Sequence, residues 1–299
     1  MNTMQSVFVI SEKEFADNIW SPKLLALIVI ITSSIFSRTY LSGITQNSDL
    51  LGGFLDVAKI ISLFLPLVGV VLGFDAISKE KDSGALNVLL THPVYRDTIV
   101  AGKTLGAMGT LALIVFISTI TVIGARLISS GLELNSLAIS RLLIFSILTY
   151  FYLSIFISFA MFSSIITNNS TNALIYNIAT WLILCIAFGM IAATAASFVT
   201  DEKPLDLSDN NNFLIMNANL QQLSPSHHYL MAVSGNPSPG WSGVSSGRPE
   251  VDGIFDTKHT LHQWWNELGV NVIILIISPV FLTIITYIVF LRKDLSNVG

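Results

Sequence analysis

Residues 73–106 read GFDAISKEKDSGALNVLLTHPVYRDTIVAGKTLG, and this stretch constrains how the rest of the chain is arranged. It is rich in charge, with four acidic and four basic residues between Phe74 and Lys103. These are Asp75, Glu80, Asp82, Asp97, Lys79, Lys81, Arg96 and Lys103. Apolar runs long enough to cross a bilayer flank the stretch on both sides. A charged hairpin between two membrane spans must face water, so its apolar residues need cover, and the simplest cover is a partner protein.

The composition places the chain among membrane proteins. Of its 299 residues 52% are hydrophobic and only 11% are charged, against about 25% charged in soluble domains. The mean hydropathy of +0.69 agrees. The net charge of −4 disfavours nucleic acid as a partner. The single cysteine, Cys185, cannot form an internal disulfide, and the first ten residues lack the basic region of a signal peptide.

The pattern predicts an all-α polytopic membrane protein with six transmembrane helices, because ~20 apolar residues cross a bilayer. The expected spans lie near residues 24–41, 54–74, 98–127, 137–167, 172–199 and 269–291. Before the first span, residues 4–20 predict an amphipathic helix. Phe8, Phe15 and Ile19 share one arc of it, with Lys13 and Asp17 opposite. Such a helix can lie in the membrane interface.

The distribution of Lys and Arg predicts the orientation, because short cytoplasmic loops are enriched in them. With both termini inside, the cytoplasmic side carries Lys13, Lys23, Lys79, Lys81, Arg96, Lys103, Arg292 and Lys293. The outer side then carries Arg38, Lys59, Arg126 and Arg141 in its short loops and span ends. Of these, Arg38, Arg126 and Arg141 can snorkel to the interface. We therefore expect a multi-pass plasma-membrane protein with both termini cytoplasmic.

A long segment, residues 200–268, separates the fifth and sixth spans and is expected outside the membrane. It is rich in Pro, Gly, Ser and Asn and contains eight acidic and three basic residues. Residues 213–223 and 258–268 predict short helices, the second with a Trp pair suited to the membrane interface. The chain is therefore predicted to have three parts. Residues 1–199 hold the interfacial helix, five spans and the hairpin, and residues 200–268 form a small extracytoplasmic subdomain. Residues 269–299 form the last span and a cytoplasmic tail.

The hairpin itself predicts a transverse helix held between two long ones. Asp82, Ser83 and Gly84 form a break, and residues 85–90 form a short amphipathic helix. Pro93 suits the first position of the helix that follows. Such an element can transmit a push from a soluble partner to two spans at once.

At these residues the chain resembles type-2 ABC exporter permeases. The matching positions are Phe74, Asp75, Ile77, Glu80, Gly84, Leu89, Leu90, Pro93, Arg96, Gly102 and Lys103. Ala85 replaces a usual Thr, and His92 is unusual before the proline. The opening segment SEKEFADNIWSPK, residues 11–23, resembles the elbow helix of the same family, with an acid–aromatic pair at Glu14 and Phe15.

The resemblance implies a permease that dimerises and binds two copies of an ABC ATPase, with the 74–104 hairpin as coupling helix. The implied ATPase-coupling residues are Asp75, Glu80, Gly84, Leu86, Leu89, Leu90, Pro93, Arg96 and Lys103. Glu80 is the acid expected to meet a basic or polar group on the ATPase. The implied interfacial-helix residues are Phe8, Glu14, Phe15 and Ile19. ATP and Mg are expected on the partner ATPase, with no cofactor bound by this chain.

The chain carries no phosphate-binding loop of its own. Gly102-Lys103-Thr104 matches the end of that motif, but its first glycine would fall at Asp97. Hydrolysis of ATP is therefore assigned to another chain. The alternative function is a non-transporting membrane anchor or assembly subunit whose outer domain binds a partner.

Two weaker patterns lie in the outer segment. Gly243-Val244-Ser245-Ser246-Gly247 fits a nucleophile elbow, but its proline-rich surroundings favour turn residues. His227, His228, His259 and His262 could be metal ligands, and the last two share a face if they lie on one helix. Since their spacing matches no zinc signature, surface or interfacial histidines are the default and no metal is expected.

Overall fold

The computed structural model describes residues 3–45, 54–82, 96–130, 135–200, 211–236 and 251–292, and these residues form helices and turns without a strand. Six helical stretches are long and apolar enough to cross a membrane. They are Pro22–Ser42, Val57–Asp82, Asp97–Ser129, Ser136–Ile166, Ser170–Thr200 and Leu261–Arg292. The prediction of an all-α protein with six spans is confirmed, and the chain is a multi-pass membrane protein.

The helices follow one another in a simple order. They are α1 (Thr3–Ile19), α2 (Pro22–Thr45), α3 (Phe54–Phe64), α4 (Pro66–Gly73), α5 (Ser78–Asp82), α7 (Arg96–Ser130), α8 (Ser136–Ile166), α9 (Ser170–Leu182), the π-helix η1 (Ile183–Ala187), α10 (Phe188–Thr200), α11 (Asn211–Gln221), α12 (Pro225–Ser234) and α13 (Leu261–Arg292). The second span comprises α3, α4 and α5, and the fifth comprises α9, η1 and α10.

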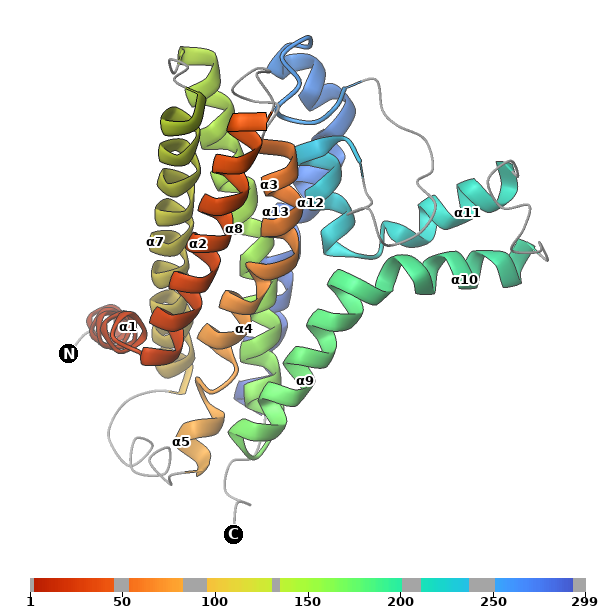
Figure 1. Ribbon diagram of the computed structural model, residues 1–299. Coiled ribbons are helices and arrows are strands. Elements are labelled where there is room, and N and C mark those ends of the chain that lie inside the picture. Colours follow the sequence, from red (N-terminus) through yellow and green to blue (C-terminus); the bar gives the residue numbers. More distant parts are fainter. Residues whose placement is uncertain are drawn as a thin grey trace.

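Most of the spans form one upright bundle, in which α8 packs against α4, α7, α12 and α13 (Figure 1). The fifth span leaves this bundle, and α10 extends away from it with α11 running back along α10. The short helix α5 and the end of α13 lie at one end of the bundle, and α12 and the start of α13 lie toward the other. The start of α1 and the end of α13 therefore lie toward the α5 end.

The second span packs closely on α8 because two of its residues lack side chains. A Cβ atom placed on Gly73 would lie 2.6 Å from Ala160 Cβ, and one on Gly69 would lie 3.0 Å from the carbonyl oxygen of Leu153. Small residues that bring backbones together are typical of helix pairs in membranes. The contact makes α4 one of the most enclosed helices of the protein, with Val68, Val70 and Leu72 buried.

Pro66 interrupts the second span between α3 and α4, because proline has no N–H to donate to the turn before it. Two carbonyls of that turn are instead paired from neighbouring spans. The hydroxyl of Tyr152 donates to the carbonyl of Ser62 at 2.7 Å, and the indole of Trp181 donates to that of Leu63 at 2.8 Å. The break therefore ties the second span to the fourth and fifth. A second interruption, at residues 74–77, separates α4 from α5.

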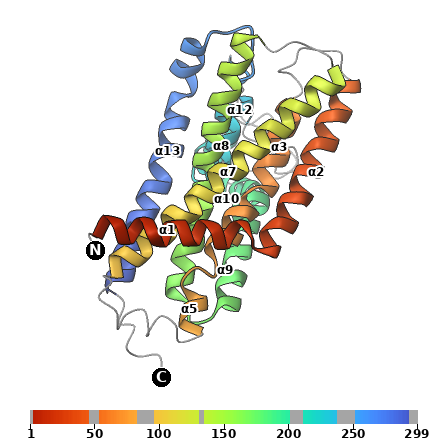
Figure 2. The ribbon, with the colours of Figure 1, turned by 90° about the vertical axis from the view of Figure 1, so that its left-hand side faces the viewer.

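The predicted N-terminal helix is confirmed as α1, which lies across the bundle (Figure 2). Its inner face rests on glycines of α7, where a Cβ on Gly102 would lie 2.6 Å from Ile10 Cβ and one on Gly106 2.6 Å from Glu14 Cβ. The inner face is therefore not centred on the predicted apolar arc. Phe8 of that arc is 73% exposed, while Phe15 is partly buried.

The outer segment follows its prediction in part. The helix predicted at 213–223 is α11, whereas residues 261–268 of the second predicted helix are the first turns of α13. No break separates them from the last span, because Gly269 sits inside α13 under the ring of Trp265. The helix α12 was not predicted. Tyr229 of α12 and Phe255 of the following turn belong to the same hydrophobic core as the spans.

Two of the three arginines expected to snorkel are instead buried in the protein. Arg126 and Arg141 are each 1% exposed. The guanidinium of Arg141 donates to the carbonyl of His259 at 2.7 Å and to that of Ile254. The reason is that residues 251–260 fold over the start of α8 and supply carbonyl oxygens there. Arg141 thereby fastens the outer segment to the fourth span.

Candidate coupling site at the base of the charged hairpin

The described part of the hairpin is its base, formed by the end of the second span and the start of α7. Of the expected coupling residues, the side chains of Asp75, Glu80 and Lys103 lie within it, and Arg96 begins α7. The remaining five lie outside the described residues, namely Gly84, Leu86, Leu89, Leu90 and Pro93. Their predicted contact with an ATPase therefore stays a prediction.

A three-membered ion cluster joins the base of the hairpin to the N-terminal helix. The ammonium of Lys103 on α7 lies 2.9 Å from a carboxylate oxygen of Glu14 on α1 and 2.9 Å from one of Glu80 on α5. The side chain of Lys103 is only 10% exposed, so these charge-assisted contacts are poorly screened by water. The cluster locks three separate elements together. Glu80, expected to meet the ATPase, already has a partner within its own chain.

Two neighbouring residues of α5, Lys81 and Asp82, form hydrogen bonds with the turn between the fourth and fifth spans. Lys81 is buried and donates to the carbonyls of Thr167 at 3.1 Å, Ser164 at 3.4 Å and Ile165, where α8 ends. A cation is favourable there because the last carbonyls of a helix lack intrahelical partners and carry partial negative charge.

Asp82 takes the complementary position at the start of α9. Its carboxylate accepts hydrogen bonds from the backbone N–H of Ser170 at 3.0 Å and from the hydroxyl of Ser170 at 3.1 Å. An anion is favoured at the N-terminus of a helix. In addition, the hydroxyl of Ser164 accepts from the backbone N–H groups of Ile77 and Ser78, both at 2.9 Å. Thus α5 is fixed to both helices of the turn.

The contacts of Lys81 and Asp82 with this turn were not predicted from the sequence. The available signal was a Lys-Asp pair together with the short polar turn at residues 168–171. A cation suits a helix end and an anion a helix start, but only the fold places that pair beside that turn.

Asp75 makes a weaker link to the first span. Its carboxylate lies 3.7 Å from the ammonium of Lys23, which also sits 5.3 Å from the centre of the Phe74 ring. The Lys23 side chain is 68% exposed, so we expect this pair to contribute little to stability.

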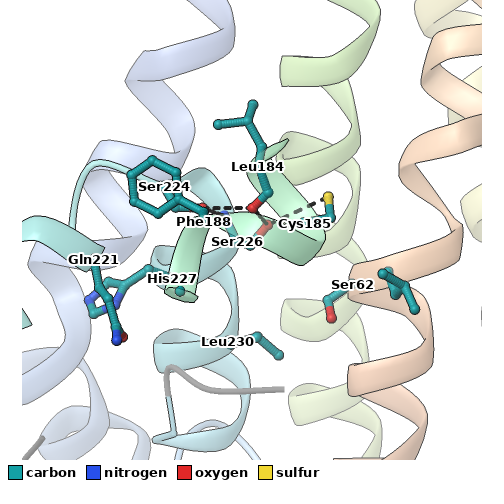
Figure 3. Close-up of a pocket in the computed structure, with 11 residues that line it drawn as sticks. Ser62, Leu184, Cys185, Phe188, Gln221, Ser224, Ser226, His227 and Leu230 are labelled. Carbon is teal, nitrogen blue, oxygen red and sulfur yellow. Dashed lines mark hydrogen bonds between the residues drawn. The ribbon is translucent and has the colours of Figure 1, made fainter. Parts of the chain in front are cut away.

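A second polar cluster lies where α12 meets the fifth span (Figure 3). The π-helix η1 loosens the regular hydrogen bonding there. The carbonyl of Leu184 accepts from the hydroxyls of Ser224 at 3.1 Å and Ser226 at 3.4 Å. The adjoining cavity of about 30 Å³ is large enough for one water. The Nδ1 atom of His227 at its edge is buried and has no hydrogen-bond partner among the described residues, and burial lowers the pKa of this imidazole to about 4.

The other outer histidines are dispersed among separate partners. His228 contacts the side chain of Asn271 at 2.8 Å and the carbonyl of Gln222 at 2.7 Å. His259 pairs with Asp256 at 2.7 Å in the turn before α13, so it does not share a helix face with His262, contrary to the sequence pattern. Within the described ranges, no three His, Cys, Asp or Glu residues come together as a metal site would need.

Six spans, a crossing N-terminal helix and a charged base between the second and third spans agree with the membrane-spanning subunit of an ABC transporter. A family model described as "ABC-2 family transporter protein" matches residues 8–295, and the chain belongs to this family. The family resemblance found in the hairpin is therefore confirmed.

Two similar proteins are both named "Probable ABC transporter permease protein NosY". The protein from Stutzerimonas stutzeri is 28% identical over 195 residues, which cover 63% of this chain and 70% of that protein. The protein from Pseudomonas aeruginosa is 31% identical over 110 residues, covering 34% of this chain and 39% of that protein. Both similarities agree with a permease subunit.

Proposed function

We propose that the chain forms the substrate pathway of an ATP-driven exporter as a dimer, powered by two separate ATPase subunits that grip the 74–104 hairpin. ATP and Mg would bind to those subunits. Closure of the ATPases would displace the hairpins, and the spans would rearrange to alternate access. The chain would span the plasma membrane. Its termini and the hairpin would lie in the cytoplasm, and the 200–268 segment would lie outside.

The observation that carries this proposal is the attachment of α5 to several spans. Through Glu80 and Lys103 it holds α7 and α1, through Lys81 the end of α8, and through Asp82 the start of α9. A force on the hairpin would therefore reach the third, fourth and fifth spans together. A merely solvated loop would need none of these contacts.

The exposed fifth span supports the dimer. Its residues Ile175, Tyr176, Met190, Ile191 and Phe198 are between 50% and 81% exposed, and they continue along α9 and α10. A shallow apolar groove along the end of η1 and α10, lined by Ala187 and Ala195 among others, would let a helix of a second copy approach closely.

The experiment separates gripping of the hairpin from transmission through α5. The chain is co-purified with its ATPase and reconstituted, and ATPase binding and ATP turnover are measured. Leu89→Asp should weaken ATPase binding at least about tenfold, since loss of a buried leucine anchor costs ~2–5 kcal/mol. The double variant Lys81→Met, Asp82→Asn should keep ATPase binding while its stimulation of ATP turnover falls about tenfold, because charged hydrogen bonds contribute ~1.5–3 kcal/mol each.

Glu250→Lys, a charge change in the outer segment, serves as the control and should leave both measurements unaltered. Two results would contradict the proposal. One is normal turnover in both hairpin variants. The other is the absence of any ATPase partner, which would favour the non-transporting anchor instead.

A further inference from the structure

A charged cavity lies beside the ion cluster, between α1, α2, the end of the second span and α7. Its volume is about 340 Å³. Eight charged side chains line it: Lys13, Glu14, Asp17, Lys23, Asp75, Lys79, Glu80 and Lys103. With four of each sign, the lining is neutral overall, yet it holds many separated charges. A ligand that carries both a positive and a negative group fits such a lining better than a simple anion or cation.

Some of these charges are already engaged and others are available. Lys103 joins Glu14 and Glu80, and Lys23 lies near Asp75. By contrast, the lining residues Lys13, Asp17 and Lys79 are exposed, and none of their side chains makes an ion pair or hydrogen bond to another described residue. Lys13 and Asp17 are four residues apart on α1 and so share a face. Among the described residues, two ammonium groups and one carboxylate of the cavity lining are therefore unpaired.

Exposed aromatic residues on and beside α1 indicate that this cavity lies near the level of lipid headgroups. The helix crosses the bundle (Figure 2) and exposes Phe8 by 73%, and Trp20 directly after it is 78% exposed. Exposed aromatic residues of this kind, and tryptophan above all, collect at the membrane–water interface. The cavity also has an apolar wall, which includes Leu24, Val71 and Leu72. Charged and apolar linings thus meet in one site, as a lipid with a polar head and acyl chains requires.

We propose that this cavity binds a zwitterionic phospholipid with a primary ammonium headgroup, such as phosphatidylethanolamine. Lys13 and Lys79 bind the phosphate, Asp17 accepts hydrogen bonds from the ammonium, and the acyl chains leave along the apolar wall. A quaternary ammonium cannot donate these hydrogen bonds, so phosphatidylcholine binds more weakly. An anionic lipid without an amine, such as phosphatidylglycerol, leaves Asp17 facing negative charge.

The test uses the purified, delipidated full-length chain and native mass spectrometry. The chain is mixed with micelles that contain phosphatidylethanolamine, phosphatidylcholine or phosphatidylglycerol of identical acyl chains. Phosphatidylethanolamine should bind about tenfold more tightly than the other two, as charge-assisted hydrogen bonds to its ammonium predict.

Asp17→Asn should abolish the preference over phosphatidylcholine. Lys13→Gln with Lys79→Gln should weaken both zwitterionic lipids. Asp252→Asn with Lys258→Gln, a matched pair of exposed charges in the outer segment, should change nothing.

Melting curves check that every variant remains folded, and a variant that fails is replaced by the single change Lys79→Gln. Preferred binding of phosphatidylglycerol, or unchanged phosphatidylethanolamine binding in the Asp17 and lysine variants, would overturn the proposal. Soluble glycerophosphoethanolamine separates a lipid from a free zwitterion. Its failure to displace the lipid supports the lipid site, whereas displacement at equal concentration would assign the cavity to a soluble ligand.

Discussion

The second span ends where the fifth begins, yet the two have opposite surroundings. In the most apolar stretch of the second span, 72% is buried within the protein, whereas in that of the fifth span only 17% is buried. Gly69 and Gly73 bring the second span against α8, whereas the fifth leaves the bundle at η1 (Figure 1). Two spans that meet at one base can therefore differ in role, the second as a packed hub and the fifth as a surface open to a partner.

The two spans nevertheless remain connected along their length. At the base, Asp82 holds the start of α9, and further along Trp181 donates to the carbonyl of Leu63. Ser226 of α12 contacts the carbonyl of Leu184, three residues after Trp181, and the hydroxyl of Tyr152, which in turn donates to Ser62 of the second span. The fifth span thus contacts the hub at several points while one of its faces stays exposed.

The largest expected effect comes from disturbing the hub. Gly73→Val should destabilise the protein by about 3 kcal/mol, because its Cβ would lie 2.6 Å from Ala160 Cβ and overpacked cores lose this much. The unfolding free energy in mixed micelles measures the effect. Gly124→Val is the matched control, since a Cβ at Gly124 meets nothing within 4 Å. Equal stability of the two variants would show that the second span is not the packed hub.

The second prediction concerns the cavity between the hub, the fifth span and α12. Burial, followed by the neighbouring His228, lowers the pKa of His227 to about 4 from its ordinary 6.5. The unfolded chain therefore binds this proton more readily, and stability falls as the pH drops from 6.5 toward 4. At pH 5 the loss is about 2 kcal/mol, since a tenfold difference in proton affinity between the folded and unfolded chain corresponds to about 1.36 kcal/mol.

The variant His227→Leu removes this titration. Between pH 7 and pH 5 its unfolding free energy should fall about 2 kcal/mol less than that of the natural chain, by the same proton linkage. The difference between the two pH profiles isolates His227 from the other titrating groups. Parallel profiles would mean that water reaches the imidazole, and that the spans around this cavity are more open than the structure shows.

The sequence was sufficient for the large features because each rests on a strong local pattern. Long apolar runs predicted six spans, and the amphipathic pattern before Trp20 predicted α1. The hairpin motif predicted the family, which the match over residues 8–295 confirms. Hydrophobic length and a short motif are properties of neighbouring residues, so no tertiary information was needed.

The contacts of the site depend on tertiary packing and were less accessible. Lys81 and Asp82 act on a turn more than 80 positions away, and Arg141 reaches carbonyls over 110 positions away. The position of Arg141 near a span end suggested that its side chain snorkels to water. Instead, residues 251–260 fold over α8, and their carbonyl oxygens bind the guanidinium in place of water. Nothing in the sequence indicated the π-helix, because residues 172–199 have the pattern of one continuous apolar helix.

The last prediction tests the open surface, and its effect on stability should be smallest. Ile191 on α10 is 50% exposed, and Ile284 on α13 is 53% exposed. Exposure alone does not distinguish them, because lipid covers apolar side chains of either helix. They differ in that Ile191 borders the groove, whose small residues permit close helix approach.

In a Cys185→Ser background, Ile191→Cys and Ile284→Cys should each change stability by less than about 0.5 kcal/mol, as surface substitutions usually do. Oxidation in native membranes should nevertheless link Ile191→Cys into dimers, because a disulfide forms only when the two Cα atoms come within about 7 Å. Ile284→Cys should remain monomeric. Dimers from both variants would indicate random collision, and dimers from Ile284→Cys alone would move the dimer contact from the fifth span to the sixth.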